Sequence, residues 1–447
     1  MHILSGRSLR LHQEEEMSGM ADRPILRRRQ WLLTRDFSLV WWSQVLSQVA
    51  DGVSKLALLW FVYSITGSAL KTTIIGLLQT LPPIVLGPMI GVVVDRLPKK
   101  AILICSDVAR ALLIGLIPCW VSAESFTVQS LYVLTFLYGI ATAMFIPTLS
   151  SSVPLMVGQK QLTAANALLQ STTSLGIIIG PLISGLGIAF SGSQDVLCIN
   201  AVTYLASAAF LFPLRLSSGM TTSPRENRRT TAIEDLFDGI RYTLISRRTI
   251  LLLIILASLY TFGSGAFTTL FPVFGKNLLS LGPAEVGYLW SWLGVGLLLV
   301  SLCLVRFTEW DLRRRVSVIA WSSAVGGLAL CGLVWTANIT VATLLVMVIG
   351  MGLGTWTPIA WGIIQEISPS HMVGRVMALY TAIATATSMA GMTFFGWLIE
   401  VSGESMSLIG IGAVLLALAM SSLWFRRRVA EEHLSGESRL LPSARHQ

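Results

Sequence analysis

Charged residues are scarce in this 447-residue chain: they make up 12% of it, whereas hydrophobic residues make up 53%. A soluble domain carries roughly 25% charged residues, so this composition excludes a soluble protein. The mean hydropathy is +0.71, and whole stretches such as 250–259 and 316–334 contain no charged residue. The chain is therefore predicted to be an integral membrane protein.

Residue types that hold metals or act as nucleophiles are also few, with five histidines and five cysteines. The cysteines all fall in apolar stretches without the spacing of a metal site, and we interpret them as small packing residues. The sequence contains no Gly-x-x-x-x-Gly-Lys-Ser/Thr phosphate loop, no His-Glu-x-x-His and no Cys-x-x-Cys. No motif therefore indicates a membrane enzyme or an ATP-driven pump. We predict no enzymatic activity, no cofactor and no metal.

Apolar stretches of about 20 residues span a bilayer, because a rise of about 1.5 Å per residue covers its ~30 Å hydrocarbon layer. We predict an all-α membrane protein in which twelve transmembrane helices form two pseudo-symmetric six-helix bundles. The predicted spans are 37–63, 69–94, 101–121, 128–150, 165–190, 196–214, 248–274, 284–305, 316–336, 340–364, 372–400 and 406–425.

Lysine and arginine lie mostly on one side of these spans. Twenty-eight of the 32 fall in segments that share a side with the N-terminus, while the loops of the other side hold only Lys71 and Lys276. Basic loops stay in the cytoplasm, so both termini are predicted to be cytoplasmic in a bacterial inner membrane (the plasma membrane). The net charge of +9 thus reflects the basic loops on the cytoplasmic side. Because the basic residues are scattered over separate loops, they argue against nucleic-acid binding.

The longest polar interruption divides the spans into two sets of six. We predict a cytoplasmic N-terminal segment 1–36, a first bundle 37–214, a cytoplasmic linker 215–247, a second bundle 248–425 and a cytoplasmic tail 426–447. Hydrophobic residues of the linker recur at helical spacing between 233 and 244, which is typical of an amphipathic helix on the membrane surface. A shift of 211 residues superimposes Pro147 on Pro358 and Gly180 on Gly391, which indicates two parallel six-span repeats.

The loop between the second and third spans carries an acid and three bases within six residues. Gly91, Asp95, Arg96, Lys99 and Lys100 occur in the order Gly-x-x-x-Asp-Arg-x-x-Lys-Lys. Gly91 is expected to let a neighbouring helix approach closely. The order resembles the signature motif of the major facilitator superfamily, Gly-x-x-x-Asp-Arg-x-Gly-Arg-Arg, with Pro98 in place of a glycine.

The resemblance implies that this motif belongs to a gate. Asp95 would pack against the inner start of the eleventh span, where Ser368 and Pro369 supply an N-cap and a first-turn proline. The motif would then act as a latch that holds the inner side closed, and it would not bind the substrate.

Further segments resemble the branch of drug:proton antiporters that contains macrolide-efflux and siderophore (enterobactin) export proteins. They are Gln44, Ser47 and Asp51 in the first span, TGS at 66–68, SDVAR at 106–110, AANAL at 164–168, DGIRY at 238–242 and GRVMAL at 374–379. The resemblance implies a monomeric exporter working by alternating access, with proton-coupled efflux of an amphiphilic drug, a macrolide-like compound or a siderophore. A lipid or dedicated metabolite transporter of the same fold is an alternative, as is a non-transporting membrane protein of this lineage.

Four charged residues lie in the interior of the predicted spans, more than five residues from either end, where a charge is costly and functional by default. Asp51, midway along the first span, is the candidate proton carrier; alternatively it pairs with Lys55, four residues further on the same face. Asp107 and Arg110 lie one turn apart in the third span. Arginine stays protonated and needs a partner, which is Asp107, Asp95 or a carboxylate on another helix. We interpret Asp107 and Arg110 as part of a gating network.

Small residues and a proline mark the fifth span. Gly176, Gly180, Pro181 and Gly185 resemble the antiporter motif of the same superfamily, Gly-x-x-x-Gly-Pro-x-x-x-Gly. The alternative is close helix packing alone, which a face of small residues permits.

Polar and aromatic residues of spans one, four, seven, ten and eleven are candidates for lining a substrate cavity. They are Gln44, Gln48, Tyr138, Phe262, Trp356, Trp361, Gln365 and Tyr380. Anchoring at the membrane interface, or packing, is the alternative explanation for the aromatic residues.

Overall fold

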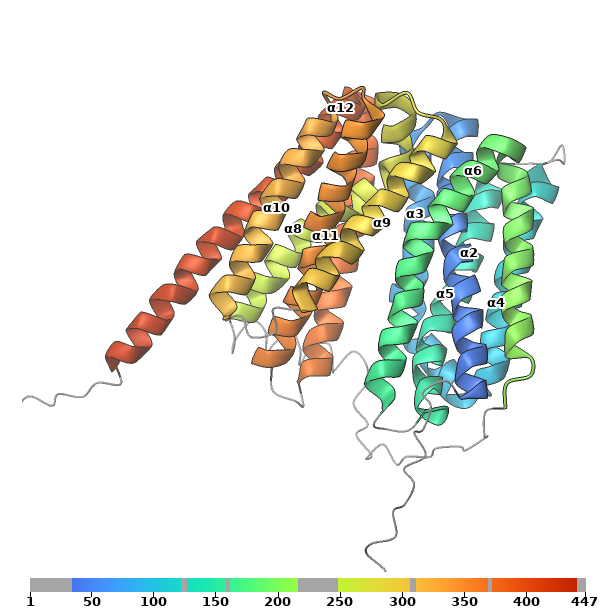
Figure 1. Ribbon diagram of the computed structural model, residues 1–447, viewed down its shortest axis with the longest axis horizontal. Helices are drawn as coiled ribbons and strands as arrows, with labels where there is room; N and C mark the ends of the chain where they lie inside the picture. The colour runs from blue at the N-terminus through green and yellow to red at the C-terminus, as the bar shows by residue number, and fades with distance from the viewer. Residues whose placement is uncertain are drawn as a thin grey trace, which may run out of the picture.

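The computed structural model describes residues 34–121, 127–157, 161–215, 248–305, 311–368 and 372–439. Every regular element in these ranges is helical (Figure 1). The elements are α2 (Arg35–Thr66), α3 (Ala69–Arg96), α4 (Lys99–Val121), α5 (Val128–Ser152), η1 (Val153–Leu155), α6 (Leu162–Leu211), α8 (Arg248–Val273), η3 (Phe274–Leu278), α9 (Pro283–Val305), α10 (Leu312–Leu333), α11 (Ile339–Ile367) and α12 (Val373–Arg439). Within the described residues, ten helical stretches are long and apolar enough to cross a membrane, which confirms the predicted all-α membrane fold.

Two of these helices, α6 and α12, are each two spans joined at a single residue. The backbone leaves the helical conformation at Gly192 (φ 89°, ψ 164°) and at Gly403 (φ 84°, ψ 171°). Only glycine adopts this conformation without strain. The breaks fall between predicted spans five and six and between spans eleven and twelve, so the ten stretches correspond to twelve crossings.

Replacing Gly403 by alanine is expected to destabilise the folded protein by about 1–3 kcal/mol, because a Cβ atom is incompatible with this backbone conformation. The midpoint of thermal unfolding of the purified protein measures the loss. Gly362→Ala is the matched control, since Gly362 lies within α11 with open space where its Cβ would be. An unchanged midpoint in the Gly403 variant would contradict the strained conformation.

Short polar residues begin several of the helices. The side chain of Thr34 accepts a hydrogen bond from the backbone N–H of Phe37 at the start of α2, and Ser68 accepts one from Lys71 at the start of α3. Asn338 caps α11 in the same way. Each cap satisfies a backbone donor that the helix itself leaves unpaired.

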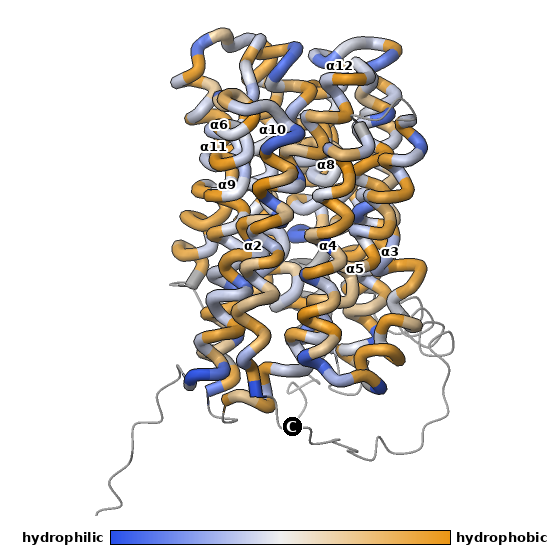
Figure 2. The backbone as a smooth tube through the Cα atoms, turned by 90° about the vertical axis from the view of Figure 1, so that its right-hand side faces the viewer, coloured by the Kyte–Doolittle hydropathy of each residue, from blue (hydrophilic) through white to orange (hydrophobic). Residues whose placement is uncertain are grey.

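The helices form two bundles side by side. Helices α2 to α6 pack together in one bundle, and α8 to α12 pack together in the other (Figure 1). Apolar residues cover most of the length of the helices, whereas hydrophilic residues gather towards both ends (Figure 2). This distribution matches an apolar bilayer bounded by water on each side.

The two bundles touch at one end of the molecule. We call the end where α2 passes into α3 the far side, and the end where α2 begins the near side. The closest approach on the far side joins α6 to α9, where a Cβ on Gly287 would overlap the carbonyl oxygen of Pro181 and lie 2.9 Å from Gly185 Cα. Towards the near side the two bundles diverge (Figure 1). The structure is therefore closed on the far side and open on the near side.

Some predictions fall outside the described residues. These are the N-terminal segment up to residue 33, the linker and its amphipathic helix at 216–247, and the last part of the tail from residue 440. The side chain of Asp95 and residues 369–371 are also outside them, so the predicted latch between these groups stays a prediction.

Candidate functional site

A polar face of α2 forms the base of the candidate site. Ser43, Ser47, Asp51 and Ser54 follow one another at intervals of four, four and three residues, and this spacing aligns side chains on one helix face. The three serines are fully buried. The polar face of α2 is thus turned into the first bundle.

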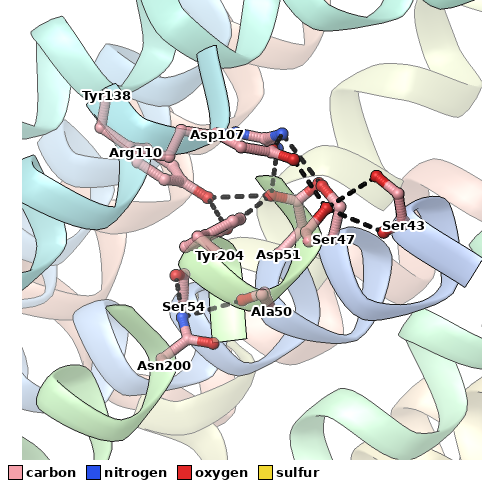
Figure 3. A network of polar contacts seen from close by, with 11 residues as sticks. Ser43, Ser47, Ala50, Asp51, Ser54, Asp107, Arg110, Tyr138, Asn200 and Tyr204 are labelled. Atoms are coloured by element: carbon pink, nitrogen blue, oxygen red, sulfur yellow. Dashed lines mark hydrogen bonds and ion pairs between the residues drawn. The ribbon is translucent and has the colours of Figure 1, made fainter. Parts of the chain in front are cut away.

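Arg110 of α4 lies at the centre of this polar cluster (Figure 3). One of its terminal nitrogens donates to Asp51 Oδ1 at 3.1 Å. The other donates to Ser47 Oγ at 2.9 Å and to Asp107. The guanidinium also lies between the rings of Phe145 and Tyr204, 4.6 and 4.8 Å from their centroids. With 1% of its side chain exposed, Arg110 is buried in the protein.

Asp51 is the member of the cluster that solvent reaches, since 25% of its side chain is exposed. Its Oδ1 accepts hydrogen bonds from Arg110, from Tyr204 at 2.6 Å and from Tyr138 at 3.1 Å. The two tyrosine hydroxyls lie 2.8 Å apart. Four helices of the first bundle therefore converge on one carboxylate (Figure 3).

Asp107 is the buried counterpart of Asp51, and none of its side chain is exposed. It receives hydrogen bonds from Arg110 and from Ser207 Oγ, the latter at 2.6 Å. The Ser207 hydroxyl lies 2.9 Å from that of Ser43. This chain of contacts fixes α4 and the second part of α6 to the polar face of α2.

The cluster carries one more negative charge than it has positive charges. Asp51 and Asp107 share a single guanidinium, that of Arg110. A buried charge without a partner is costly in a low-dielectric interior, and one proton removes the excess. Of the two carboxylates, Asp51 is the one that solvent reaches.

Sequence reasoning anticipated several of these contacts. The structure brings together Asp51, Asp107, Arg110 and Tyr138, and it supplies the carboxylate on another helix that was one alternative for Arg110. The pairing of Asp51 with Lys55 does not occur. Lys55 lies instead 5.7 Å from the ring centroid of Trp290 on α9, because Arg110 and the tyrosines already surround Asp51.

Three residues of α6 were missed by the sequence analysis. Asn200, Tyr204 and Ser207 recur at intervals of four and three residues, the same helical spacing as the polar face of α2. Asn200 donates to the Ala50 carbonyl at 3.0 Å and to Ser54 Oγ at 2.6 Å. Their spacing in an apolar span was the signal that could have found them.

The antiporter motif of α6 lies at two helix contacts. A Cβ on Gly176 would lie 2.7 Å from the Gln48 carbonyl carbon of α2, and one on Gly180 would lie 2.6 Å from Gly52 Cα. Gly185 instead faces Gly287 of the other bundle. The motif thus fixes α6 against α2 at one end and closes the far side at the other.

The bases of the near-side motif contact the first bundle only, as far as the described residues go. Lys99 Nζ donates to the Ser151 carbonyl at 2.7 Å, and the Lys100 ammonium lies 5.6 Å from the Phe212 ring, while Arg96 is exposed. The expectation that Gly91 contacts a neighbouring helix is wrong for this structure, because nothing lies within 4 Å of where its Cβ would be. The bundles are apart on this side, so none of the helices that the structure describes reaches Gly91.

The predicted cavity residues differ in their exposure, and their lining of a cavity stays a prediction. Gln44, Tyr138, Trp356 and Tyr380 are buried, Gln48 and Phe262 are partly buried, and Trp361 and Gln365 are exposed. Trp356 donates to the Tyr380 hydroxyl at 2.9 Å and stacks on Tyr260. This aromatic cluster packs inside the second bundle, whereas the polar cluster belongs to the first.

Polar contacts bridge the two bundles on the far side. Glu400 of α12 accepts hydrogen bonds from the Ser68 hydroxyl and, at 3.2 Å, from the backbone N–H of Leu70 at the start of α3. Asn277 donates both to Tyr63 of α2 and, at 2.5 Å, to Glu404. A carboxylate is stabilised by the N-terminus of a helix, so Glu400 both caps α3 and ties the bundles together.

Comparison with known proteins identifies the family. The sequence matches the model of the Major Facilitator Superfamily over residues 40–392, which is most of the chain, and the protein therefore belongs to this superfamily of membrane transporters. The structure agrees: it is similar to a bacterial homologue of the iron transporter ferroportin in an inward-facing state, with a TM-score of 0.68 at 16% identity, covering 88% of this chain and 99% of that one.

Several curated relatives are efflux proteins. The multidrug efflux pump Tap of Mycolicibacterium fortuitum is 24% identical over 87% of this chain and 95% of its own length. Macrolide efflux protein A of Streptococcus pyogenes is 22% identical over 86% and 94%, and the enterobactin exporter EntS of Shigella boydii is 25% identical over 90% and 98%. The resemblance to macrolide-efflux and siderophore-export proteins is thereby confirmed.

Proposed function

We propose that this chain is a secondary active exporter, in which inward movement of protons drives outward movement of an amphiphilic small molecule. The observation that carries the proposal is the Asp51–Arg110–Asp107 cluster, whose single excess negative charge lies at mid-span with Asp51 exposed. Intramembrane carboxylates of this kind mark ion pathways. The names of the efflux relatives support the outward direction of transport and a drug-like, macrolide-like or siderophore cargo.

The two-bundle arrangement supports alternating access as the mechanism. In this conformation the far side is held by the Gly185–Gly287 contact and by the hydrogen bonds of Glu400 and Asn277. Export requires these contacts to break while the near-side surfaces, including the Gly91 face of α3, come together. Rocking of one bundle against the other around a mid-membrane site accounts for such a change.

The placement in the membrane completes the proposal. The near side is assigned to the cytoplasm, with both termini there, because it carries most of the lysine and arginine. We assign the first bundle to 37–214 and the second to 248–425, connected by the cytoplasmic linker 215–247. We assign the protein to a bacterial inner membrane and propose that it acts as a monomer, as the resemblance to the superfamily implies.

Export is tested by the retention of fluorescent dyes and macrolides in energised cells that express the chain. We expect retention to fall, and an uncoupler that collapses the proton gradient to restore it. Asp51→Asn is expected to reduce uncoupler-sensitive efflux at least tenfold, because the variant has no carboxylate to exchange protons with solvent. Glu366→Gln is the control, since Glu366 pairs with Arg315 in an exposed position at the near side.

The proposal fails if no compound's retention responds to the chain, or if the uncoupler has no effect on a response that does occur. Efflux that survives in the Asp51→Asn variant would assign Asp51 to structure alone. Equal amounts of folded protein in the membrane, judged by a single symmetric peak in size-exclusion chromatography, make the comparison valid.

A further inference from the structure

Lys55 is a charged residue near mid-membrane that the polar cluster does not use. It stands one helical turn beyond Asp51 towards the far side of α2. An ammonium group at this depth is costly and is retained for a function by default. The question is therefore what neutralises it.

No carboxylate of the described residues forms an ion pair with Lys55. Asp51, one turn away, is occupied by Arg110, Tyr138 and Tyr204. The contact that the structure gives Lys55 is the ring of Trp290, 5.7 Å from its ammonium. A cation–π contact at this distance is weak and does not replace a counter-ion.

Solvent reaches the Lys55 side chain, although its helix neighbours are fully buried. Lys55 is exposed, whereas Ser54 and Leu56 have no exposed surface. Because Trp290 belongs to α9, the lysine points across the boundary between the two bundles. A molecule that binds here would contact both bundles, which is what a cargo must do to couple its binding to their relative movement.

We propose that Lys55 binds an anionic group of the cargo at the boundary between the two bundles, beside the buried ring of Trp290. An ammonium presents three donors and a compact positive charge, and the natural ligand for it is a carboxylate, sulfonate or phenolate oxygen. Together with the amphiphilic cargo of the proposed exporter, this makes the cargo class an amphiphilic anion. This assignment rests on the proposed exporter function and narrows its substrate class.

Two dyes that differ in one charged group test the assignment. 8-Anilinonaphthalene-1-sulfonate carries a sulfonate, and N-phenyl-1-naphthylamine has the same ring skeleton without it. Binding of each dye to the purified full-length protein in lipid nanodiscs is measured by fluorescence titration, with empty nanodiscs subtracted. The proteins compared are the unchanged chain, Lys55→Gln, Lys55→Arg and Lys71→Gln. Lys71 is an exposed lysine at the far end of α3, so its variant removes the same charge elsewhere.

The unchanged chain is expected to bind the sulfonated dye more tightly than the neutral one. Lys55→Gln should lower the affinity for the sulfonated dye about tenfold or more, as expected for loss of a charged hydrogen-bond donor. The affinity for the neutral dye should stay unchanged. Lys55→Arg and Lys71→Gln should bind both dyes as the unchanged chain does. The proposal is overturned if Lys55→Gln binds the sulfonated dye as tightly as the unchanged chain does. It is also overturned if the substitution weakens the binding of both dyes equally, or if the unchanged chain binds the two dyes equally well.

The outcome is separable from that of the proposed function, because equilibrium binding needs no proton gradient. A chain that binds the sulfonated dye through Lys55 but shows no uncoupler-sensitive export refutes the exporter and keeps the anion site. A chain that exports but binds both dyes independently of Lys55 refutes the anion site and keeps the exporter.

Discussion

Replacing Arg110 by methionine is expected to abolish export and to destabilise the folded protein by about 3–5 kcal/mol, the usual cost of removing one partner of a buried ion pair. The substitution leaves Asp51 and Asp107 without their shared cation. It also removes the donor that holds Ser47 against α4. The loss is measured as the shift of the thermal unfolding midpoint, together with dye efflux from energised cells.

Two further variants separate charge from packing. Arg110→Met combined with Asp107→Asn and Asp51→Asn removes all three charges, and we expect it to recover most of the stability but none of the export. Arg315→Met breaks an exposed pair with Glu366 and should cost at most about 1 kcal/mol. Full stability of the single Arg110 variant would contradict the cluster described here.

Gly287→Ala is expected to stop transport by preventing closure of the far side. The added methyl group would overlap the carbonyl oxygen of Pro181 and lie 2.9 Å from Gly185 Cα, so α6 and α9 must separate. Because both atoms belong to the backbone, no side chain can move aside to relieve the overlap. We expect the conformational equilibrium to shift towards the far-side-open state and efflux to fall at least tenfold.

The shift is measured by the distance between spin labels on the far side, one on each bundle. Lys71→Cys and Met406→Cys supply exposed positions once the five native cysteines are replaced. Gly287→Ala should lengthen this distance. Gly332→Ala, where the nearest atom lies 3.7 Å from the new Cβ, should leave distance and transport unchanged. An unaltered distance in Gly287→Ala would show that the far side accommodates the methyl group.

The sequence predicts the fold well because the bilayer imposes it. Apolar stretches of fixed length must become helices that satisfy their own backbone, and most of the predicted spans match the helices to within a few residues. The last one does not, because α12 continues to Arg439 while the predicted span ended at 425. The sequence analysis did not predict that single residues join the spans in α6 and α12, although the predicted span boundaries lay on either side of these joints. Gly192 and Gly403 resemble many other glycines in the sequence, and their conformation depends on how neighbouring spans pack.

The candidate site was predicted only in part, because contacts between helices depend on their rotation. Asp51, Asp107 and Arg110 attract attention as charges in apolar spans, whereas Tyr204 and Ser207 are ordinary residues until they face Asp51 and Asp107. Lys55 illustrates the same limit: spacing along one helix placed it beside Asp51, but the helices that surround Asp51 fill the space around it. Partner choice between helices is a property of the assembled bundle.

The joints at Gly192 and Gly403 decide where the far side can be modified. Each reverses the chain within one residue, so no loose connection exists at these points for a tag, an antibody or a protease to reach. The connection between η3 and α9, residues 279–282, is non-helical and includes Ser280 at a positive φ of 53°. A reporter peptide meant to mark the far side, which we propose faces outward, belongs there, where it lengthens an existing turn instead of splitting a helical hairpin.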